Sequence, residues 1–536
     1  MTSKLRVAYA TLCPFLLLAG LCVLSRAGAA QDRVGGPSAA FVRTQGGWLV
    51  DGQNRVLILH GINLSGRSKR PPFLPDVDRA DVAQLRKWGF NSVRYLITWE
   101  AVEPEPGAYD DAHLDKVAER LGWCRQAGLR VVLDMHQDLY SRKYGGDGAP
   151  HWACIDDDIP FAKARGAWYL SYASPAVIKA FDSFWANRPG PGGVGIQDRF
   201  IAAWQHVARR FRDDRNVVGY DLLNEPYYGS DIYAMFFAVA LALGREFDME
   251  TKAKFLGFMA NPKGAVQFMA QAVQELKRRK ALWRILDETS GPAQRFEYTT
   301  LQPFYNRLVQ AIREVDPNHI CFFETAGGPA SGTRFRTAID VPRDPGGRPF
   351  GNVVLAPHHY DLSTDLHFPY DGTVESVLSE LRRAASAADR MNVPMWFGEW
   401  GAVFKSSPET DRLVRDHLDA FDRLLCSWAW WDHTKGLKDL SHLSLLGRPY
   451  AQATAGVPTR MACADREFHL EFEPFPEGGE TRIWVAPSLK TRVDIRLHPQ
   501  TKSAKWRRDE SGTIHAQCPG GVSACSVTIV LTPEPE

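Results

Sequence analysis

Two glutamates in this 536-residue sequence stand at the ends of short apolar segments, in positions suited to chemistry. Glu225 lies in an Asn-Glu-Pro motif that ends the segment 217–225, and Glu399 lies in a Phe-Gly-Glu-Trp motif that ends the segment 394–400. Two carboxylates that face each other fit glycoside hydrolysis, in which one acts as an acid and the other as a nucleophile or base. Each motif alone is weak evidence, because a Glu at a strand end also caps helices or pairs with Arg.

Most of the apolar segments carry polar or aromatic side chains at or near their carboxyl ends. These residues are Asn63, Arg94, His136, Asn224, His358, Tyr360 and Trp431. Two carboxylates with different catalytic roles need surroundings that hold their pKa values apart. A hydrogen bond from His136, Asn224 or Tyr360 to one carboxylate and not to the other would supply that difference. The combined set predicts that Glu225 and Glu399 work as a pair.

Eight apolar segments alternate with amphipathic segments, as they do in chains of βαβ units. The predicted strands are Val56–Asn63, Ser92–Trp99, Arg130–His136, Val217–Glu225, Ile320–Thr325, Val353–Tyr360, Pro394–Trp400 and Ser427–His433. Their nearly continuous apolar character is typical of parallel strands that are buried on both faces. The segments between them show helical periodicity, most clearly in Ile196–Phe211 and Val374–Met391.

Eight strands with intervening helices predict an α/β fold of the (β/α)8 TIM-barrel type. In such a barrel the active site lies at the carboxyl ends of the strands, which is where the polar side chains are. A doubly wound sheet also gathers polar strand ends at its switch point. It would not bring eight strand ends into one ring, so the barrel is favoured.

The residues at these strand ends resemble those of the clan A glycoside hydrolases, and of family 5 in particular. That family has Arg on strand 2, His on strand 3, Asn-Glu on strand 4, His-x-Tyr on strand 6, Glu on strand 7 and Trp on strand 8. The matching positions are Arg94, His136, Asn224, Glu225, His358, Tyr360, Glu399 and Trp431. The resemblance covers roughly residues 40–435 and implies that Glu225 is the acid/base, that Glu399 is the nucleophile, and that the anomeric configuration is retained.

The same resemblance implies roles for the neighbouring residues. Asn224 would hold the sugar 2-hydroxyl group, Tyr360 would steady Glu399, and Arg94 would orient the nucleophile and help keep it ionised. Trp431 would form the platform for a sugar ring, with the adjacent Trp430 as the alternative.

Longer motifs narrow the resemblance to one branch of family 5. They are Asp134–Ser141 (DMHQDLYS), Gly145–Trp152 (GGDGAPHW), Ser174–Val177 (SPAV) and Ala180–Trp185 (AFDSFW). The series is similar to that of the endoglycoceramidases and their glycosylceramidase relatives, which cleave the β-glycosidic bond between glycan and ceramide. By this resemblance Asp138 and Lys69 bind the sugar next to ceramide. The alternatives are a helix N-cap for Asp138 and a basic surface loop for Lys69, because Arg67 and Arg70 lie beside it.

An apolar segment, Ile232–Leu243 (IYAMFFAVALAL), lies in a long predicted insert at about 228–300, after the fourth strand. Twelve residues are too few to span a bilayer but suit a buried or interfacial helix. We expect the segment either to line a ceramide site, to make transient contact with a membrane or micelle surface, or to pack beneath the insert.

The pattern changes after the last predicted barrel strand. Four segments alternate at period two, namely Glu467–Phe472, Thr481–Val485, Arg492–Leu497 and Ser526–Leu531. This alternation predicts a small antiparallel β-sandwich, with the barrel at 31–445 and the sandwich at 446–536. The endoglycoceramidases likewise carry such a domain after the barrel. Stabilising packing is the expected role of the sandwich, and carbohydrate binding is the alternative.

The first 30 residues are typical of a signal peptide. Lys4 and Arg6 precede the apolar run Val7–Leu24, and Ala27–Ala30 (AGAA) supplies the small residues of a cleavage site. We therefore expect a secreted protein. At about 18 residues the apolar run is near the lower limit for a membrane span, so an uncleaved anchor is the alternative.

Composition excludes several other classes of protein. The formal net charge is only +2, and no long Lys/Arg block is present, so a nucleic-acid partner is not expected. The sequence has neither a Cys-x-x-Cys nor a His-Glu-x-x-His motif, so no metal and no cofactor are predicted.

By the resemblance given above, the expected substrate is a glycosphingolipid. The alternatives are an exo-acting glucosylceramidase or steryl-glucosidase, a cellulase or mannanase, and a glycan-binding barrel that has lost catalysis.

Overall fold

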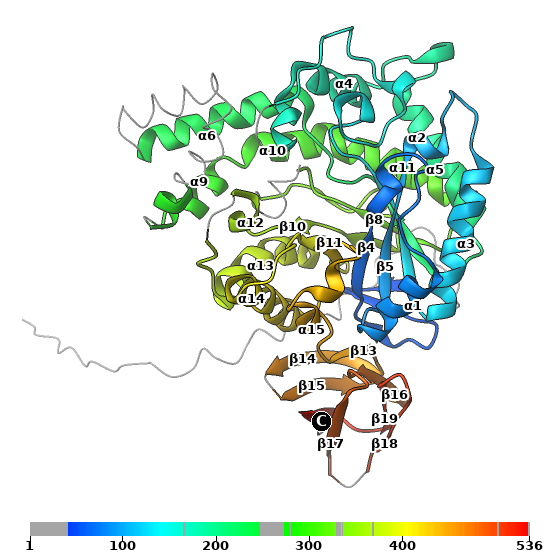
Figure 1. Ribbon diagram of the computed structural model, residues 1–536, viewed down its shortest axis with the longest axis vertical. Helices are drawn as coiled ribbons and strands as arrows, with labels where there is room; N and C mark the ends of the chain where they lie inside the picture. Colours follow the sequence, from blue (N-terminus) through cyan, green and yellow to red (C-terminus); the bar gives the residue numbers. More distant parts are fainter. Residues whose placement is uncertain are drawn as a thin grey trace, which may run out of the picture.

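The computed structural model describes residues 41–533, apart from 165–167, 247–272, 279, 328–333, 335, 367–368, 465 and 501–502. Its central feature is a parallel sheet in the order β10-β11-β12-β4-β5-β6-β7-β8-β9 (Figure 1). The bounds of these strands are β4 His60–Leu64, β5 Ser92–Thr98, β6 Arg130–His136, β7 Val217–Asp221, β8 Ile320–Phe323, β9 Val353–Leu355, β10 His358–His359, β11 Trp396–Gly401 and β12 Ser427–Trp431. All eight predicted barrel segments therefore contribute to one sheet.

The sheet closes into a barrel through its sixth strand. β9 and β10 are two halves of the predicted segment 353–360, separated by Ala356 and Pro357. β9 pairs with β8, and β10 pairs with β11. Because Pro has no N–H to give to a ladder, the strand is interrupted at this point, and its two short halves form the two ends of the sheet. The two ends belong to one stretch of chain, so the predicted (β/α)8 barrel is confirmed.

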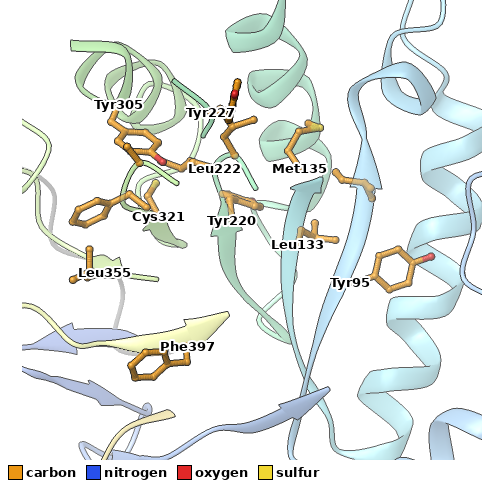
Figure 2. Close-up of a cluster of buried hydrophobic side chains, with 14 of the residues drawn as sticks. Tyr95, Leu133, Met135, Tyr220, Leu222, Tyr227, Tyr305, Cys321, Leu355 and Phe397 are labelled. Carbon is orange, nitrogen blue, oxygen red and sulfur yellow. The ribbon is translucent and has the colours of Figure 1, made fainter. Parts of the chain in front are cut away.

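The strand residues alternate between two environments. On β6, Val131, Leu133 and Met135 lie in the large core between the sheet and the helices, where Figure 2 shows Leu133 and Met135 among other buried side chains. Val132 belongs instead to the smaller cluster that fills the barrel. Asp134, the next inward residue, is fully buried and begins the polar layer. The barrel interior is thus apolar at one end and polar at the carboxyl ends of its strands.

Six of the described helices cover the sheet, and two of them match the predicted ranges 196–211 and 374–391. The six are α1 Arg79–Lys87, α3 Asp111–Ala127, α5 Ile196–Phe211, α11 Gln302–Arg313, α13 Val374–Met391 and α14 Pro408–Leu424. Side-chain caps fix several of their starts: Thr373 caps α13 and Ser407 caps α14, each in a reciprocal capping box.

The first predicted strand is wrong in one respect. The segment 56–63 divides between two sheets, because β3 (Val56–Leu57) pairs with β13 (Tyr450–Thr454) outside the barrel, and only β4 joins the barrel. β3 also pairs with β2 (Trp48–Val50), which pairs with β1 (Arg43–Gln45). Residues 43–57, assigned by sequence to the barrel, thus form one sheet with the C-terminal segment. Every residue of 56–63 is buried, so burial does not show where the chain changes sheet.

The C-terminal segment is an antiparallel β-sandwich, as predicted, with more strands than the four that alternation revealed. One sheet has the order β1-β2-β3-β13-β16-β19-β18, and the other has the order β14-β15-β20-β17. The remaining strands are β14 Gly456–Ala464, β15 Glu467–Pro474, β16 Gly478–Trp484, β17 Leu489–His498, β18 Lys505–Arg508, β19 Ile514–Pro519 and β20 Ala524–Pro533. Cys518 and Cys525 face each other across the sandwich core as free thiols.

The sandwich packs against the amino-terminal ends of the barrel strands (Figure 1). The ring of Trp484 lies against Gly89, in the loop that leads into β5, and Tyr450 donates a hydrogen bond of 2.9 Å to the carbonyl of Gly89. The polar layer lies at the other end of the barrel. We therefore assign the sandwich to the face opposite the candidate site.

The insert after β7 begins with helix α6 (Ile232–Glu246) and continues through α9 (Leu282–Glu288) and α10 (Gly291–Phe296). Among the described helices, none combines the length and apolar character needed to cross a membrane. The predicted signal peptide, residues 1–30, lies outside the described residues, as does the middle of the insert.

Candidate active site

Glu225 and Glu399 come together at the carboxyl ends of β7 and β11. Both are buried, and a carboxylate oxygen of each lies within 4.8 Å of the other and of a His358 ring nitrogen. Glu225 has a backbone φ of +43°, in the left-handed region that L-residues rarely adopt. Gln137 Nε2 supports this backbone by donating to the carbonyl oxygens of Asn224 and Glu225 at 2.9 and 3.1 Å.

Arg94 is the centre of the polar layer. Its guanidinium donates to Glu399 Oε1 at 2.6 Å, to Asn224 Oδ1 at 2.8 Å and to Asp221 Oδ2 at 2.8 Å. It also lies 2.9 Å from Asp134 Oδ1. Because Arg94 is completely buried, these carboxylates are what keeps its charge compensated. The arginine in turn fixes the nucleophile candidate and the Asn224 amide relative to each other.

The second oxygen of Glu399 is held by Tyr360, whose hydroxyl donates to Oε2 at 2.6 Å. Glu399 therefore receives hydrogen bonds on both oxygens, from a cation and from a phenol. Gly398 makes room for this arrangement, because a Cβ at that position would lie 2.9 Å from His358 Nε2. Asn63 Nδ2 donates to the carbonyl of Gly398 at 3.1 Å and supports the same turn.

His358 connects the two glutamates. Its Nδ1 lies 3.0 Å from Glu225 Oε1 and 3.6 Å from Glu399 Oε2. Its Nε2 lies 3.2 Å from Glu324 Oε1. Glu324 follows β8 and was not singled out from the sequence. Its place as the penultimate residue of the predicted segment 320–325 is the signal that could have identified it.

The surroundings shift the pKa values of the two glutamates in opposite directions. Burial raises the pKa of Glu225, and this effect outweighs the opposing hydrogen bond and charge of His358. Burial also favours a raised pKa for Glu399, but His358, Arg94 and His136 outweigh it and lower the pKa. One carboxyl group is thus poised to hold a proton and the other to remain ionised.

A second group of polar residues adjoins this network through Asp134. His136 Nδ1 lies 2.8 Å from Asp134 Oδ2, and the His136 ring stacks on Trp431 at an interplanar angle of 15°. Burial and Lys69 lower the pKa of His136, but Asp134 and Asp138 outweigh them and raise it to about 10. Trp431 is half-buried, whereas Trp430 is 1% exposed, so only Trp431 is placed to meet a ligand.

Lys69 and Asp138, predicted to bind sugar, form an ion pair with 2.5 Å between Nζ and Oδ2. The Lys69 ammonium also lies 4.7 Å from the centroid of the Trp431 ring, so it is not a loose surface cation. Asp147, which the sequence analysis did not assign, lies 3.9 Å from Lys69 Nζ. Burial raises the pKa of Asp147 to about 7, with Lys69 opposing.

Three groups in the described part of the chain bring potential metal ligands within 4.8 Å of one another. They are His136, Asp138 and Asp147; Asp221, Glu324 and His358; and Glu225, His358 and Glu399. Each contains a carboxylate that already pairs with a cation, because Lys69 contacts Asp138 and Arg94 contacts Asp221 and Glu399. The arrangement is suited to proton transfer and nucleophilic attack at a sugar.

Comparison with known proteins agrees with this geometry. The family model described as Cellulase (glycosyl hydrolase family 5) matches residues 54–436. Endoglycoceramidase I of Rhodococcus hoagii is 25% identical over 462 residues, which cover 83% of this chain and 80% of the relative. A glucosylceramidase of Aspergillus fumigatus is 32% identical over 246 residues, covering 35% of this chain and 32% of that protein.

Solved structures of endo-glycoceramidase II from Rhodococcus sp. give the same result. The five-membered iminocyclitol complex superposes with a TM-score of 0.69 at 26% identity and covers 90% of this chain and 99% of that one. The same enzyme has been solved as a lactosyl-enzyme intermediate and as a ganglioside GM3 complex, both at 25% identity and a TM-score of 0.68. This chain therefore belongs to glycosyl hydrolase family 5, in its endoglycoceramidase branch.

Proposed function

We propose that this protein is a retaining β-glycosidase that hydrolyses the bond between glycan and ceramide in glycosphingolipids. The observation that carries the proposal is the pair Glu225 and Glu399, which lie within 4.8 Å and have oppositely shifted pKa values. A short separation suits direct attack by one carboxylate, whereas an inverting enzyme needs room for a water molecule between sugar and base. The relatives named above support ceramide as the aglycone.

In the first step Glu399, held ionised by Arg94 and Tyr360, attacks the anomeric carbon. The C–O bond to ceramide breaks, and Glu225 gives its proton to the departing oxygen, so ceramide leaves as an alcohol. The glycan remains as an ester on Glu399, and Glu225 is left as a carboxylate.

In the second step Glu225 takes a proton from a water molecule, whose oxygen attacks the anomeric carbon and releases Glu399. The free glycan leaves with its original anomeric configuration, and Glu225 regains its proton. Asn224, fixed by Arg94, donates to the sugar 2-hydroxyl during both steps, and Trp431 carries the ring. Lys69 and Asp138 bind hydroxyl groups of the sugar next to ceramide.

The alternative within the same chemistry is an exo-acting glucosylceramidase, favoured by the 32% identity to the Aspergillus fumigatus enzyme. The test incubates the protein separately with a GM3-type ganglioside and with glucosylceramide and weighs the released sugar by mass spectrometry. Release of an intact oligosaccharide supports the endo reaction. Release of glucose from glucosylceramide alone selects the exo reaction, and no release from either lipid contradicts the proposal.

We also propose that the protein is secreted and meets its substrate at a membrane or micelle surface through helix α6. Tyr233, Phe237 and Leu241 are spaced four residues apart on α6, and 50%, 66% and 57% of their surfaces are exposed. The opposite side of α6, including Met235, is buried against the main core. A helix with one packed and one exposed apolar side suits insertion into the interface of a lipid layer.

Replacing Phe237 and Leu241 with Ser tests this surface. Hydrolysis of a ceramide glycoside in vesicles should fall roughly 30-fold or more, because each of these apolar side chains contributes about 1–3 kcal/mol when it is buried in lipid. Hydrolysis of a soluble aryl glycoside should not change. The matched control is Trp506→Ser, which removes an exposed aromatic ring from strand β18 in the sandwich. Equal losses on both substrates would contradict lipid contact.

The proposed secretion has a separate test. If the exported protein retains residues 1–30, the signal peptide is not cleaved.

A further inference from the structure

We propose that Glu324 is a positioning residue for the acid carboxyl of Glu225, acting on its backbone directly and on its side chain through His358. This inference rests on the proposed acid/base role of Glu225. Glu324 follows strand β8, next to β7, and 2% of its surface is exposed. Its two oxygens make two different contacts, and both lead to Glu225.

The first contact holds the backbone. Glu324 Oε2 accepts a hydrogen bond of 3.0 Å from the N–H of Glu225. Glu225 has the left-handed φ noted above, a conformation that is unfavourable for an L-residue and persists only when its surroundings hold it. Glu324 and Gln137 hold the Asn224–Glu225 peptide from its two sides, through the N–H of Glu225 and the carbonyl of Asn224.

The second contact orients a ring. Glu324 Oε1 lies 3.2 Å from His358 Nε2, while Nδ1 of the same ring lies 3.0 Å from Glu225 Oε1. Glu324 and His358 Nε2 hold one hydrogen between them. The ring then carries its other hydrogen on Nδ1, which donates it to Glu225 Oε1. When Oε1 accepts this hydrogen bond, the acid proton of Glu225 resides on Oε2. Glu324 thereby selects the oxygen from which the glycosidic bond is protonated.

Glu324 is itself fixed in place. Its backbone N–H donates to the hydroxyl of Tyr305 at 3.2 Å, and Arg94 Nη2 lies 3.5 Å from Oε1. Glu324 takes part in no bond-making or proton-transfer step, and the only proton transferred to the leaving group is that of Glu225. Glu324 is therefore assigned no direct contact with substrate.

The test compares Glu324→Gln and Glu324→Ala on two substrates that share a glycan. A ceramide glycoside needs full protonation of its leaving oxygen, and a dinitrophenyl glycoside needs almost none. Acid catalysis contributes about 10²–10⁴-fold, so misplacing the proton should lower kcat/KM on the ceramide substrate by about 10–100-fold. On the dinitrophenyl substrate the loss should be less than about threefold. Gln should retain more activity than Ala, because its carbonyl still accepts the Glu225 N–H.

The matched control is Glu297→Gln. Glu297 is also buried, but its carboxylate accepts from Ala326, Thr337 and Ala338 rather than contacting Glu225 or His358. Its replacement should lower activity on both substrates equally, or not at all. Equal losses for Glu324→Gln on both substrates, or no loss, would overturn the inference.

A measurement that needs no catalytic turnover tests the role of Glu324 independently of the proposed function. Because it uses the wild-type protein, misfolding of a Glu324 variant does not affect it. Nitrogen-15 NMR of labelled histidines in the wild-type protein, with His358 assigned by its loss in His358→Gln, reports which ring nitrogen carries hydrogen. We expect a protonated Nδ1 from about pH 5 to 8. A bare Nδ1 in this range would contradict the inference even if the protein hydrolyses ceramide glycosides, and a protonated one supports it even if the substrate differs.

Discussion

Arg94 donates a hydrogen bond of 2.6 Å to Glu399, and 0% and 5% of the two side chains are exposed to solvent. A buried ion pair gives stability only when its remaining polar atoms are also satisfied. Here the other nitrogens of Arg94 bond to Asp221, Asn224 and Asp134. The pair is therefore an organised part of the barrel interior, and it places the nucleophile candidate where its charge can be maintained.

Replacing Arg94 with Lys should damage both fold and activity, because an ammonium has no planar fork to reach four partners. We expect the free energy of unfolding to fall by about 3–5 kcal/mol, since buried carboxylates lose their partner. The pKa of Glu399 should rise, so the acidic limb of kcat/KM should move to higher pH. Thermal unfolding and a pH profile measure both effects, and Arg125→Lys, at an exposed ion pair with Asp214, is the control. An unchanged acidic limb would contradict the assigned electrostatic role.

The pH dependence of the wild-type activity follows from the opposite pKa shifts of Glu225 and Glu399. The pKa of Glu399 is lowered, so its ionised form persists below the ordinary range of a glutamate and is lost only as the pH falls further. The pKa of Glu225 is raised, so its proton persists above the ordinary range and is lost as the pH rises. We expect a bell-shaped dependence of kcat/KM whose two limbs lie on either side of about pH 4.3. A profile with one limb would exclude this division of roles.

Replacing Glu399 with Gln should lower kcat on the order of 10⁴–10⁶-fold, because the amide cannot form the glycosyl ester. Binding of a glycan inhibitor should survive, as titration calorimetry can show. Substantial turnover by Glu399→Gln would refute the nucleophile assignment.

Replacing Glu225 with Ala should spare the first step on dinitrophenyl glycosides, and added azide should then yield a β-glycosyl azide.

The Lys69 ion pair makes a prediction about binding. Lys69→Met removes a donor that lies between Asp138 and the Trp431 ring, leaving a partly buried carboxylate without its cation. A hydrogen bond to a charged group contributes about 1.5–3 kcal/mol, so kcat/KM for a ceramide oligosaccharide should fall about 10–100-fold. Arg67→Met is the control, since Arg67 is an exposed cation on the same 3-10 helix and bonds only to the carbonyl of Pro71 among the contacts described. Equal effects of the two substitutions would argue against a sugar-binding Lys69.

The contact between sandwich and barrel is also testable. At Gly89 the backbone φ is +102°, and a Cβ would lie 2.7 Å from the Trp484 ring. Gly89→Ala should lower the free energy of unfolding by about 2–4 kcal/mol, combining backbone strain with overpacking. Gly128→Ala, at a φ of +73° with no atom within 4 Å of its Cβ, measures the strain alone, at about 1 kcal/mol. Equal losses in denaturant unfolding would show that the Trp484 contact adds nothing.

Much of the barrel could be predicted because its signals are local. Polar residues such as His136, Glu225 and Glu399 follow apolar segments, and parallel strands in a barrel place their carboxyl ends on one face. The division of 56–63 between two sheets could not be predicted in this way, because Val56 and Leu57 pair with β13, whose residues lie far away in the sequence. Glu324 was missed for a related reason. A single Glu after a strand is common, and its meaning comes from contacts with Glu225 and His358, which are 99 and 34 positions away.

The sequence by itself determined the residue types, the order of strands and helices, and hence the barrel and the pair of glutamates at its mouth. Only the tertiary structure decided which glutamate holds a proton, since the pKa of each depends on burial and on charges from other strands. It also decided between Trp430 and Trp431, which are neighbours in sequence but face opposite sides of a strand. Periodicity and motifs are read along the chain, whereas proton affinity is set through space.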